Sequence, residues 1–172
     1  YQFSGNSLST TIESSKTDKM SDSGYESTKT GFAFGTRFEQ YENIFIQPRL
    51  SLYYEDIDTN ATASSALKKM EGTSTDLLLN YSIYSDKRDQ SFKPTDGSLS
   101  VFRQNLPLYA DVPALLNGYE FTTYKPVTDE VIGSFKFYSR IVNSVGDDDV
   151  KISQRLHLPS KRLRGFRRHG IG

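Results

Sequence analysis

The sequence contains no cysteine and no tryptophan, and only two histidines among its 172 residues. Without cysteine there is neither a disulfide framework nor a thiolate metal site, and this absence fits a reducing cytosol and a cell envelope equally well. His157 and His169 stand apart on loop segments, with no nucleophile pattern near either one. We therefore expect both histidines to be surface residues, and we predict no catalytic residue.

The chain also has no formal net charge at pH 7 with its histidines neutral. The 21 basic residues balance the 21 acidic residues, which excludes a globally basic nucleic-acid-binding protein. The chain has no Gly-rich phosphate loop and no metal-ligand spacing, and the acidic run 147–149 lacks the alternate ligands and the glycine of a calcium loop. We accordingly predict no cofactor, no metal and no nucleic-acid partner.

Long apolar runs are absent as well, and none approaches the roughly 18 residues of a membrane-spanning helix. Only 35% of the residues are apolar, but 13% are aromatic, made up of 11 tyrosines and 11 phenylalanines. A polar chain this rich in aromatic residues is not typical of a disordered segment. It is typical of an all-β protein with two differently solvated faces, and a membrane location stays open because barrel strands alternate in hydrophobicity.

Apolar and polar residues alternate with a period of two along most of the chain. In the clearest segment, residues 44–55, Leu50 belongs to the apolar series and Arg49 and Ser51 to the polar one. Pro48 is discordant there, because a proline cannot donate to a central ladder, and it predicts a bulge or a weakened register. The pattern predicts seven strands, near residues 7–14, 27–38, 44–55, 74–85, 98–105, 118–125 and 130–142.

The links between these strands are expected to differ in length. Long polar loops are predicted at 15–27, 57–73 and 143–160, and tighter links at 39–43 and 127–130. Short turns on one side and long loops on the other are typical of an outer-membrane barrel. A soluble β-sandwich alternates too, although its turns usually come about every 8 to 12 residues. The pattern favours the barrel and leaves the sandwich as the alternative.

Two short segments sharpen this choice. The first has a tight-turn composition, in which proline presets φ, aspartate bonds its own backbone and glycine accepts a positive φ. The second is a basic tip, in which arginine offers a rigid fork of donors, glycine allows a sharp turn and phenylalanine can wedge against a wall. Taken alone, each has a plain interpretation, a turn and a solvated basic stretch. The first segment comprises Asp89, Pro94, Thr95, Asp96 and Gly97, and the second comprises Leu163, Arg164, Gly165 and Phe166.

In this order, with three predicted strands between them, the two segments resemble the BamA-like outer-membrane assembly superfamily, also called the bacterial surface antigen family. The resemblance implies an all-β, antiparallel transmembrane β-barrel, of which residues 1–172 would form a partial barrel domain of about seven strands plus a long extracellular loop at 143–172. The Asp89–Gly97 segment would then be a periplasmic turn. Arg164 would lie at the tip of the extracellular loop, and its acidic partners would lie on later strands.

The same resemblance implies a non-enzymatic role in assembling and inserting proteins into the bacterial outer membrane. The partners would be membrane lipid, nascent outer-membrane proteins and accessory assembly lipoproteins. The alternatives are a two-partner-type secretion pore of the same superfamily and, in a different class, a soluble β-sandwich adhesin or carbohydrate-binding module. Because seven strands leave two unpaired edges, we also expect this part of the barrel to self-associate edge to edge.

Overall fold

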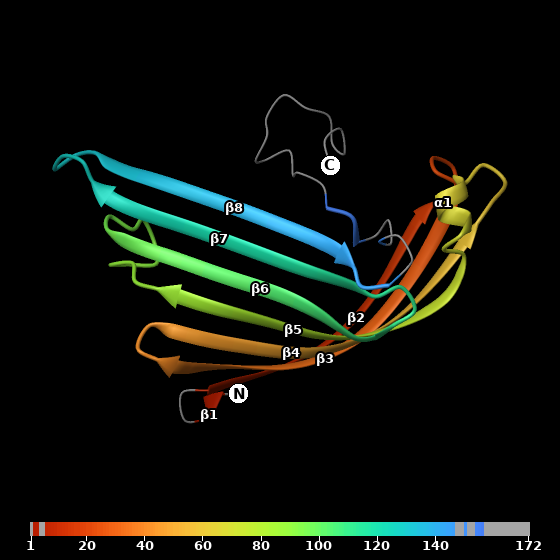
Figure 1. The fold of residues 1–172 in the computed structure, drawn as a ribbon, viewed down its shortest axis with the longest axis horizontal. Helices are drawn as coiled ribbons and strands as arrows, with labels where there is room; N and C mark the ends of the chain where they lie inside the picture. Colours follow the sequence, from red (N-terminus) through yellow and green to blue (C-terminus); the bar gives the residue numbers. More distant parts are fainter. Residues whose placement is uncertain (1, 4–5, 147–149, 151–153, 157–172) are drawn as a thin grey trace.

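The computed structural model describes residues 2–3, 6–146, 150 and 154–156, and the strands among them form one antiparallel sheet (Figure 1). Every strand pairs with its neighbours in the chain, in the order β1 to β8. The strands are β1 (Gln2–Phe3), β2 (Asn6–Lys19), β3 (Tyr25–Tyr41), β4 (Ile44–Thr59), β5 (Gly72–Asp86), β6 (Gly97–Ala110), β7 (Ala114–Pro126) and β8 (Ile132–Ser144).

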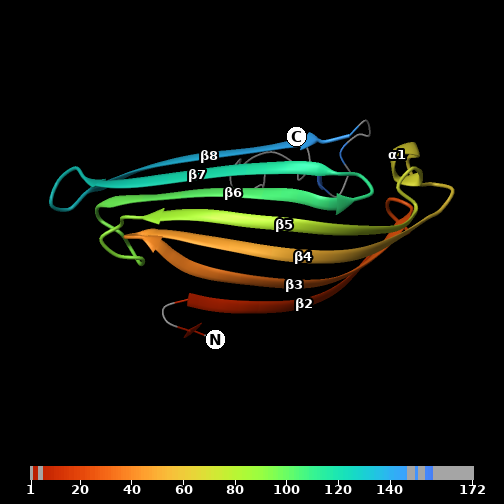
Figure 2. The ribbon, with the colours of Figure 1, turned by 60° about the horizontal axis from the view of Figure 1, so that its bottom comes forward.

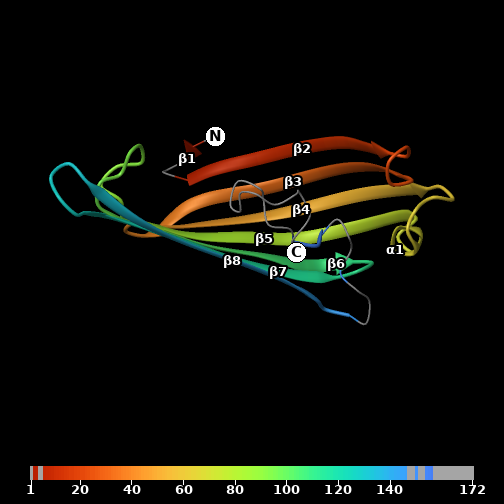
Figure 3. The same ribbon diagram turned by 90° about the horizontal axis from the view of Figure 1, so that it is seen from above.

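The predicted fold class is confirmed: seven long strands, with the two-residue β1 beside them, form a single curved sheet that is open at β8 (Figures 2 and 3). A sandwich needs two sheets packed face to face. Since the described strands all belong to one sheet, the soluble sandwich alternative is wrong. Edge-to-edge association of this part of the barrel stays a prediction.

The two faces of the sheet have the polarity of a barrel wall. On the convex face, Phe32, Leu50 and Phe135 are 49%, 45% and 59% exposed. On the concave face, Ser51 is fully buried and Ala33 is only 3% exposed. The apolar series of β4 spans 44–54, and about 10 steps of ~3.3 Å at a tilt near 40° give an apolar band of about 25 Å. That height matches the hydrocarbon layer that an outer-membrane strand must cross.

The long loop predicted at 15–27 is wrong. Strand β2 continues to Lys19 and β3 begins at Tyr25, so that residues 20–24 make a short link. The polar ends of the two strands pair above the apolar band, and Lys16 Nζ lies 2.7 Å from Glu26 Oε1. The strands extend through this polar stretch because a β-ladder is held by backbone hydrogen bonds, and polar side chains do not prevent these bonds.

The expected contrast between a short-turn end and a long-loop end is therefore only partly present. The short links 20–24 and 111–113 lie at the same end of the sheet as the long link 60–71 (Figure 1). This long link contains the four-residue helix α1 (Ser65–Lys68), capped by Ser64, whose hydroxyl accepts a hydrogen bond from the backbone of Leu67. The part of the chain that is described contains no helix long and apolar enough to cross a membrane.

Pro48 weakens one ladder without a bulge. The pairing of β3 with β4 lapses at Thr36 and Arg37, opposite the proline, and resumes in the same register. Pairing with β5 continues at Tyr81. The irregularities in these ladders lie elsewhere, between Glu39 and Tyr41 and in β5 next to Leu78. A missing N–H thus removes ladder bonds on one side of the strand only.

Candidate functional site

The link between β5 and β6, residues 87–96, is organised around one carboxylate. Asp89 accepts hydrogen bonds from the backbone N–H of Thr95 at 3.0 Å, from the Thr95 hydroxyl at 2.6 Å and from the N–H of Asp96 at 3.2 Å. The N–H of Asp89 donates in turn to the carbonyl of Asp96 at 3.2 Å. The structure therefore brings Asp89, Thr95 and Asp96 of the predicted turn motif together, and Asp89 closes the turn.

The base of this turn is held from both strands. Lys87 N–H donates to the Ser98 carbonyl at 2.8 Å. The guanidinium of Arg88 grips the Asp86 carboxylate through two hydrogen bonds of 2.8 Å. Gly97 follows with φ of +94°, in the left-handed region, and a Cβ built there would overlap the Lys87 carbonyl oxygen. The glycine of the motif is thus required both by backbone conformation and by space.

The hydrogen bonds to the carboxylate of Asp89, first the one from the Thr95 hydroxyl and then those from the backbone of Asp96 and Thr95, lower its pKa below the ordinary value of 3.8. A carboxylate with a lowered pKa in the folded state contributes stability above its unfolded pKa. That stability is lost as the pH falls through the lowered value. The turn should therefore hold at neutral pH and loosen only in acid.

We expect Asp89→Asn to remove part of this acid sensitivity. The urea midpoint of the wild-type protein should fall more steeply than that of Asp89→Asn as the pH drops from near neutrality to below 3.8, the ordinary pKa of the group. At neutral pH the variant should be the less stable of the two. Asp129→Asn, at the same end of the sheet in the link 127–131, is the matched control and should follow the wild-type curve. Parallel curves for wild type and Asp89→Asn would contradict the role of this carboxylate.

The concave wall carries cations stacked on aromatic rings. The guanidinium carbon of Arg37 lies 4.7 Å from the centre of the Phe45 ring and 5.7 Å from that of Tyr84. Arg103 lies 5.7 Å from the same Tyr84 ring and 3.2 Å from the Glu120 carboxylate. Both guanidinium groups therefore lie within cation–π range of the Tyr84 ring, and the charge of Arg103 is also paired with Glu120.

A second stack lies further along the wall, where Lys29 Nζ stands 4.2 Å from the centre of the Tyr53 ring. The ring of Tyr53 lies directly over Gly31, where a Cβ would overlap it. Ser51, a member of the predicted polar series, is fully buried and accepts a hydrogen bond of 2.9 Å from Asn80 Nδ2. The polar face of this wall is thus partly a packed layer.

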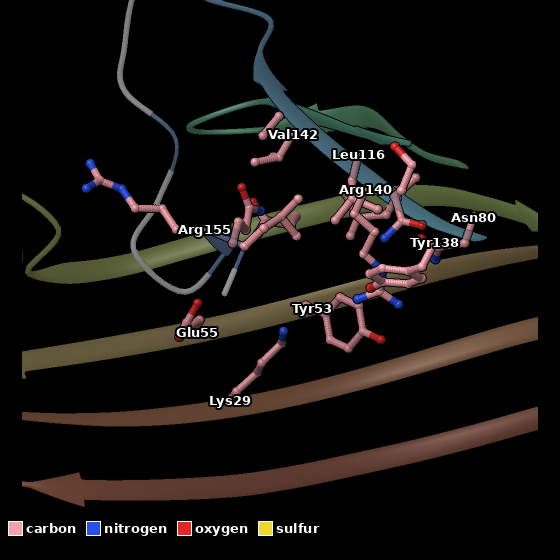
Figure 4. A pocket seen from close by; sticks show the side chains of 16 residues that line it. Lys29, Tyr53, Glu55, Asn80, Leu116, Tyr138, Arg140, Val142 and Arg155 are labelled. Carbon is pink, nitrogen blue, oxygen red and sulfur yellow. The ribbon is translucent and has the colours of Figure 1, made fainter. Parts of the chain in front are cut away.

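Lys29, Tyr53 and Asn80 help to line a cavity of about 880 Å³ on the concave side (Figure 4). Strands β3 to β8 supply its wall, and residues 154–156, beyond the end of β8, cover part of it. Gln154 Oε1 is buried there and accepts no hydrogen bond from the described residues. The described residues include no group of three His, Asp or Glu side chains that could hold a metal ion. The lining of the cavity is mixed, with Lys29, Asp76 and Arg140 beside Leu78, Leu116 and Val142.

Of the predicted turn residues, the structure brings Asp89, Thr95 and Asp96 together; the assignment of the turn and the loop tip as functional sites stays a prediction. Leu163, Arg164, Gly165 and Phe166 lie outside the described residues. The aromatic-stacked arginines of the wall were not singled out in the sequence. Their position on the polar face of alternating strands was visible, but the pairing that gathers them was not.

The comparisons with known proteins agree with this geometry. The Omp85 superfamily domain matches residues 2–172, which is nearly the whole chain. The chain belongs to the Omp85 superfamily. The resemblance to BamA-like proteins is thereby confirmed at the level of this superfamily. Because the superfamily is one of outer-membrane proteins, its members' apolar strand faces meet lipid, as the convex face of this sheet would.

This Omp85 domain is also similar to the sorting and assembly machinery component 50 homologs of Mus musculus and Homo sapiens. Each is 30% identical over 114 residues. The alignment covers 64% of this chain but only 24% of each relative. The chain therefore corresponds to a minor part of those proteins.

Proposed function

We propose that this Omp85 domain is a section of the barrel wall of a bacterial outer-membrane protein that assembles and inserts other β-barrel proteins, without enzymatic catalysis. The observation that carries the proposal is the superfamily match over residues 2–172 on a sheet with an apolar convex face and a polar concave face. The names of the curated relatives, which describe sorting and assembly, favour assembly over a secretion pore.

In this proposal the partners are membrane lipid on the convex face, nascent outer-membrane proteins, and accessory assembly lipoproteins. The turn at Asp89 faces the periplasm, and the opposite end of the sheet, with the link 60–71, faces outward. The driving force for insertion is the burial of apolar strand faces in lipid together with the pairing of new strands, so no hydrolysis is needed. In this proposal, this section of the chain supports the barrel wall.

The test uses the full-length protein reconstituted in liposomes. A urea-denatured outer-membrane barrel protein is added from outside, and its folding is followed by heat-modifiable gel mobility and protease resistance. Assembly activity predicts that folding is faster than in empty liposomes. A secretion pore predicts transfer of a soluble partner into the lumen with no effect on barrel folding. Equal folding rates with and without the protein would overturn the proposed function.

We further propose that Arg164 acts through its geometry and not merely through its charge. Simple electrostatics predicts that losing one charge has little effect, since Arg162, Arg167 and Arg168 already make the tip basic. If the Arg164 guanidinium instead forms several buried hydrogen bonds, Arg164→Lys should be nearly as harmful as Arg164→Ala. The reason is that buried acceptors left without a donor cost about 1–3 kcal/mol. Arg168→Ala should be nearly silent.

The readouts for these loop variants are heat-modifiable mobility of the full-length protein and the level of outer-membrane proteins in cells. Wild-type behaviour of Arg164→Lys would show that the loop is only a basic patch. Equal harm from Arg168→Ala and Arg164→Ala would lead to the same conclusion.

A further inference from the structure

A row of polar side chains crosses the convex face of the sheet. Tyr81 on β5, Gln104 on β6 and Asn117 on β7 pair side by side in the two ladders, and we call these three residues the amide row. Gln104 lies two residues from Leu106 on the same face, which is about 5 Å of depth at the tilt of a barrel strand. Because Leu106 is in the middle of the apolar band, the amide row lies inside the hydrocarbon layer.

Hydrogen bonds join the three side chains of the amide row. The Tyr81 hydroxyl donates to Gln104 Oε1, and Gln104 Nε2 donates to Asn117 Oδ1. The ring of Tyr81 also packs against the ring of Phe102, with 6.1 Å between their centres. The amide row is therefore ordered in advance, so that a partner which binds it immobilises few side chains.

The amide row keeps further donors and acceptors. Gln104 has a second N–H and a second lone pair on Oε1, and Asn117 Nδ2 has no acceptor among the described residues. Asn117 Nδ2 is not one of the buried atoms without a partner, so it opens onto the convex surface. Hydrocarbon offers no water to these groups, and leaving them unpaired there costs free energy. A polar group of a second membrane-embedded protein can satisfy them.

These free groups are complementary to themselves. Two copies of a barrel cross the membrane in the same direction, so a symmetric side-by-side contact has its two-fold axis along the membrane normal. With the axis beside Gln104, two Gln104 carboxamides meet at the same depth, and each offers one donor and one acceptor to the other. The axis also reverses the row, so that the free N–H groups of Asn117 lie on the side of the Tyr81 oxygen of the second copy. Symmetry thus supplies the matching set of groups.

We propose that this part of the convex face is the contact between two copies of the protein, centred on a reciprocal hydrogen-bonded pair of Gln104 carboxamides. Leu79, Leu106 and Phe102 surround the pair and pack against the second copy. The contact uses side chains of the lipid-facing surface and is distinct from edge-to-edge pairing of strands. It goes beyond the proposed function, because it requires only that the convex face meets lipid and not that the protein assembles other barrels.

The test measures energy transfer between donor-labelled and acceptor-labelled copies of the full-length protein in phosphatidylcholine liposomes, over a series of protein-to-lipid ratios. The variant Gln104→Leu, Asn117→Leu should raise the ratio at half-association about tenfold, because it removes the hydrogen bonds between copies. The matched control Thr10→Leu, Ser14→Leu removes two polar groups from the same face of β2 and should leave the ratio unchanged.

Two outcomes of the energy-transfer measurement would overturn the proposal. One is an equal ratio at half-association for the wild type and the amide variant, which would place any contact elsewhere. The other is wild-type transfer no higher than random mixing gives, as expected if a different membrane protein covers this face.

Disulfide cross-linking locates the contact with Gln104 intact, and so does not depend on the folding of the amide variant. The 172-residue sequence has no cysteine, and the full-length background is likewise made free of it. Oxidation in the liposomes should cross-link two copies through Leu106→Cys, next to Gln104, and adding Gln104→Leu should lower the yield severalfold. Leu50→Cys, on the same face two strands away, should not cross-link. Equal yields from Leu106→Cys and Leu50→Cys would show random collision and refute the contact.

Discussion

Replacing Gly97 by alanine should destabilise the full-length protein by about 3 kcal/mol or more. Two effects add at this position. The backbone has φ of +94°, a conformation that costs an L-residue about 1–2 kcal/mol. A Cβ would also overlap the Lys87 carbonyl oxygen and lie 2.8 Å from the Arg88 Cα, so that the β5–β6 turn must move. The measurement is the urea midpoint of the protein refolded in lipid.

Gly72→Ala is the control that separates these two effects. Gly72 has a comparable φ of +108°, but a Cβ there would meet no atom within 4 Å. This variant should therefore show the conformational cost alone, about 1–2 kcal/mol. If Gly97→Ala cost no more than Gly72→Ala, the close approach of Lys87 would not contribute and the packing of the turn would be misassigned.

The second large effect should come from charge on the lipid side of β5. Leu78 and Leu79 are adjacent leucines on opposite faces of the sheet. Leu79 pairs with Leu50 and Leu106 in the middle of the apolar band, whereas Leu78 lines the concave cavity. Leu79→Arg should cost about 2–4 kcal/mol, because it places a charge near the middle of the hydrocarbon. Leu78→Arg should cost about 2 kcal/mol less, since its guanidinium can reach water in the cavity.

The pair is compared by folding in lipid vesicles and by the urea dependence of heat-modifiable mobility. Leu78→Ala and Leu79→Ala measure the loss of the apolar side chain itself and are subtracted. Equal penalties for arginine at both positions would refute the assignment of the convex face to lipid.

Much of the architecture follows from local sequence. A period of two along a strand sorts its residues onto two faces, and for the segment 44–55 the predicted faces are those of the structure. The turn chemistry was also readable, because an aspartate, a proline and a glycine at this spacing bend a chain through local hydrogen bonds and permitted φ values. Even here the sequence left one thing open, namely that Asp89 closes the turn by binding Thr95 and Asp96 across six and seven residues.

Where strands begin and end was less predictable. Polarity at residues 15–27 suggested a loop, yet β2 and β3 pair through most of it. The polar residues mark where the apolar band ends, but the strand pairing continues past them. Pairing needs only backbone N–H and C=O groups. Pro48 likewise changed hydrogen bonding toward β3 but not the register, since the pairs on either side of it hold the strands in place.

The alternating all-β pattern, the lipid-compatible face and the tight turn at Asp89 could all be predicted from the residue order, because these properties depend on neighbours in the chain. Which residues meet across strands follows instead from the pairing of the whole sheet. Ser51 is buried beneath its neighbours, and Arg103 and Arg140 share one row through Gly118 although many residues separate them. Register between strands is set by turn lengths and by pairing along the whole ladder, so a shift of one residue would have sent each of these side chains to the opposite face.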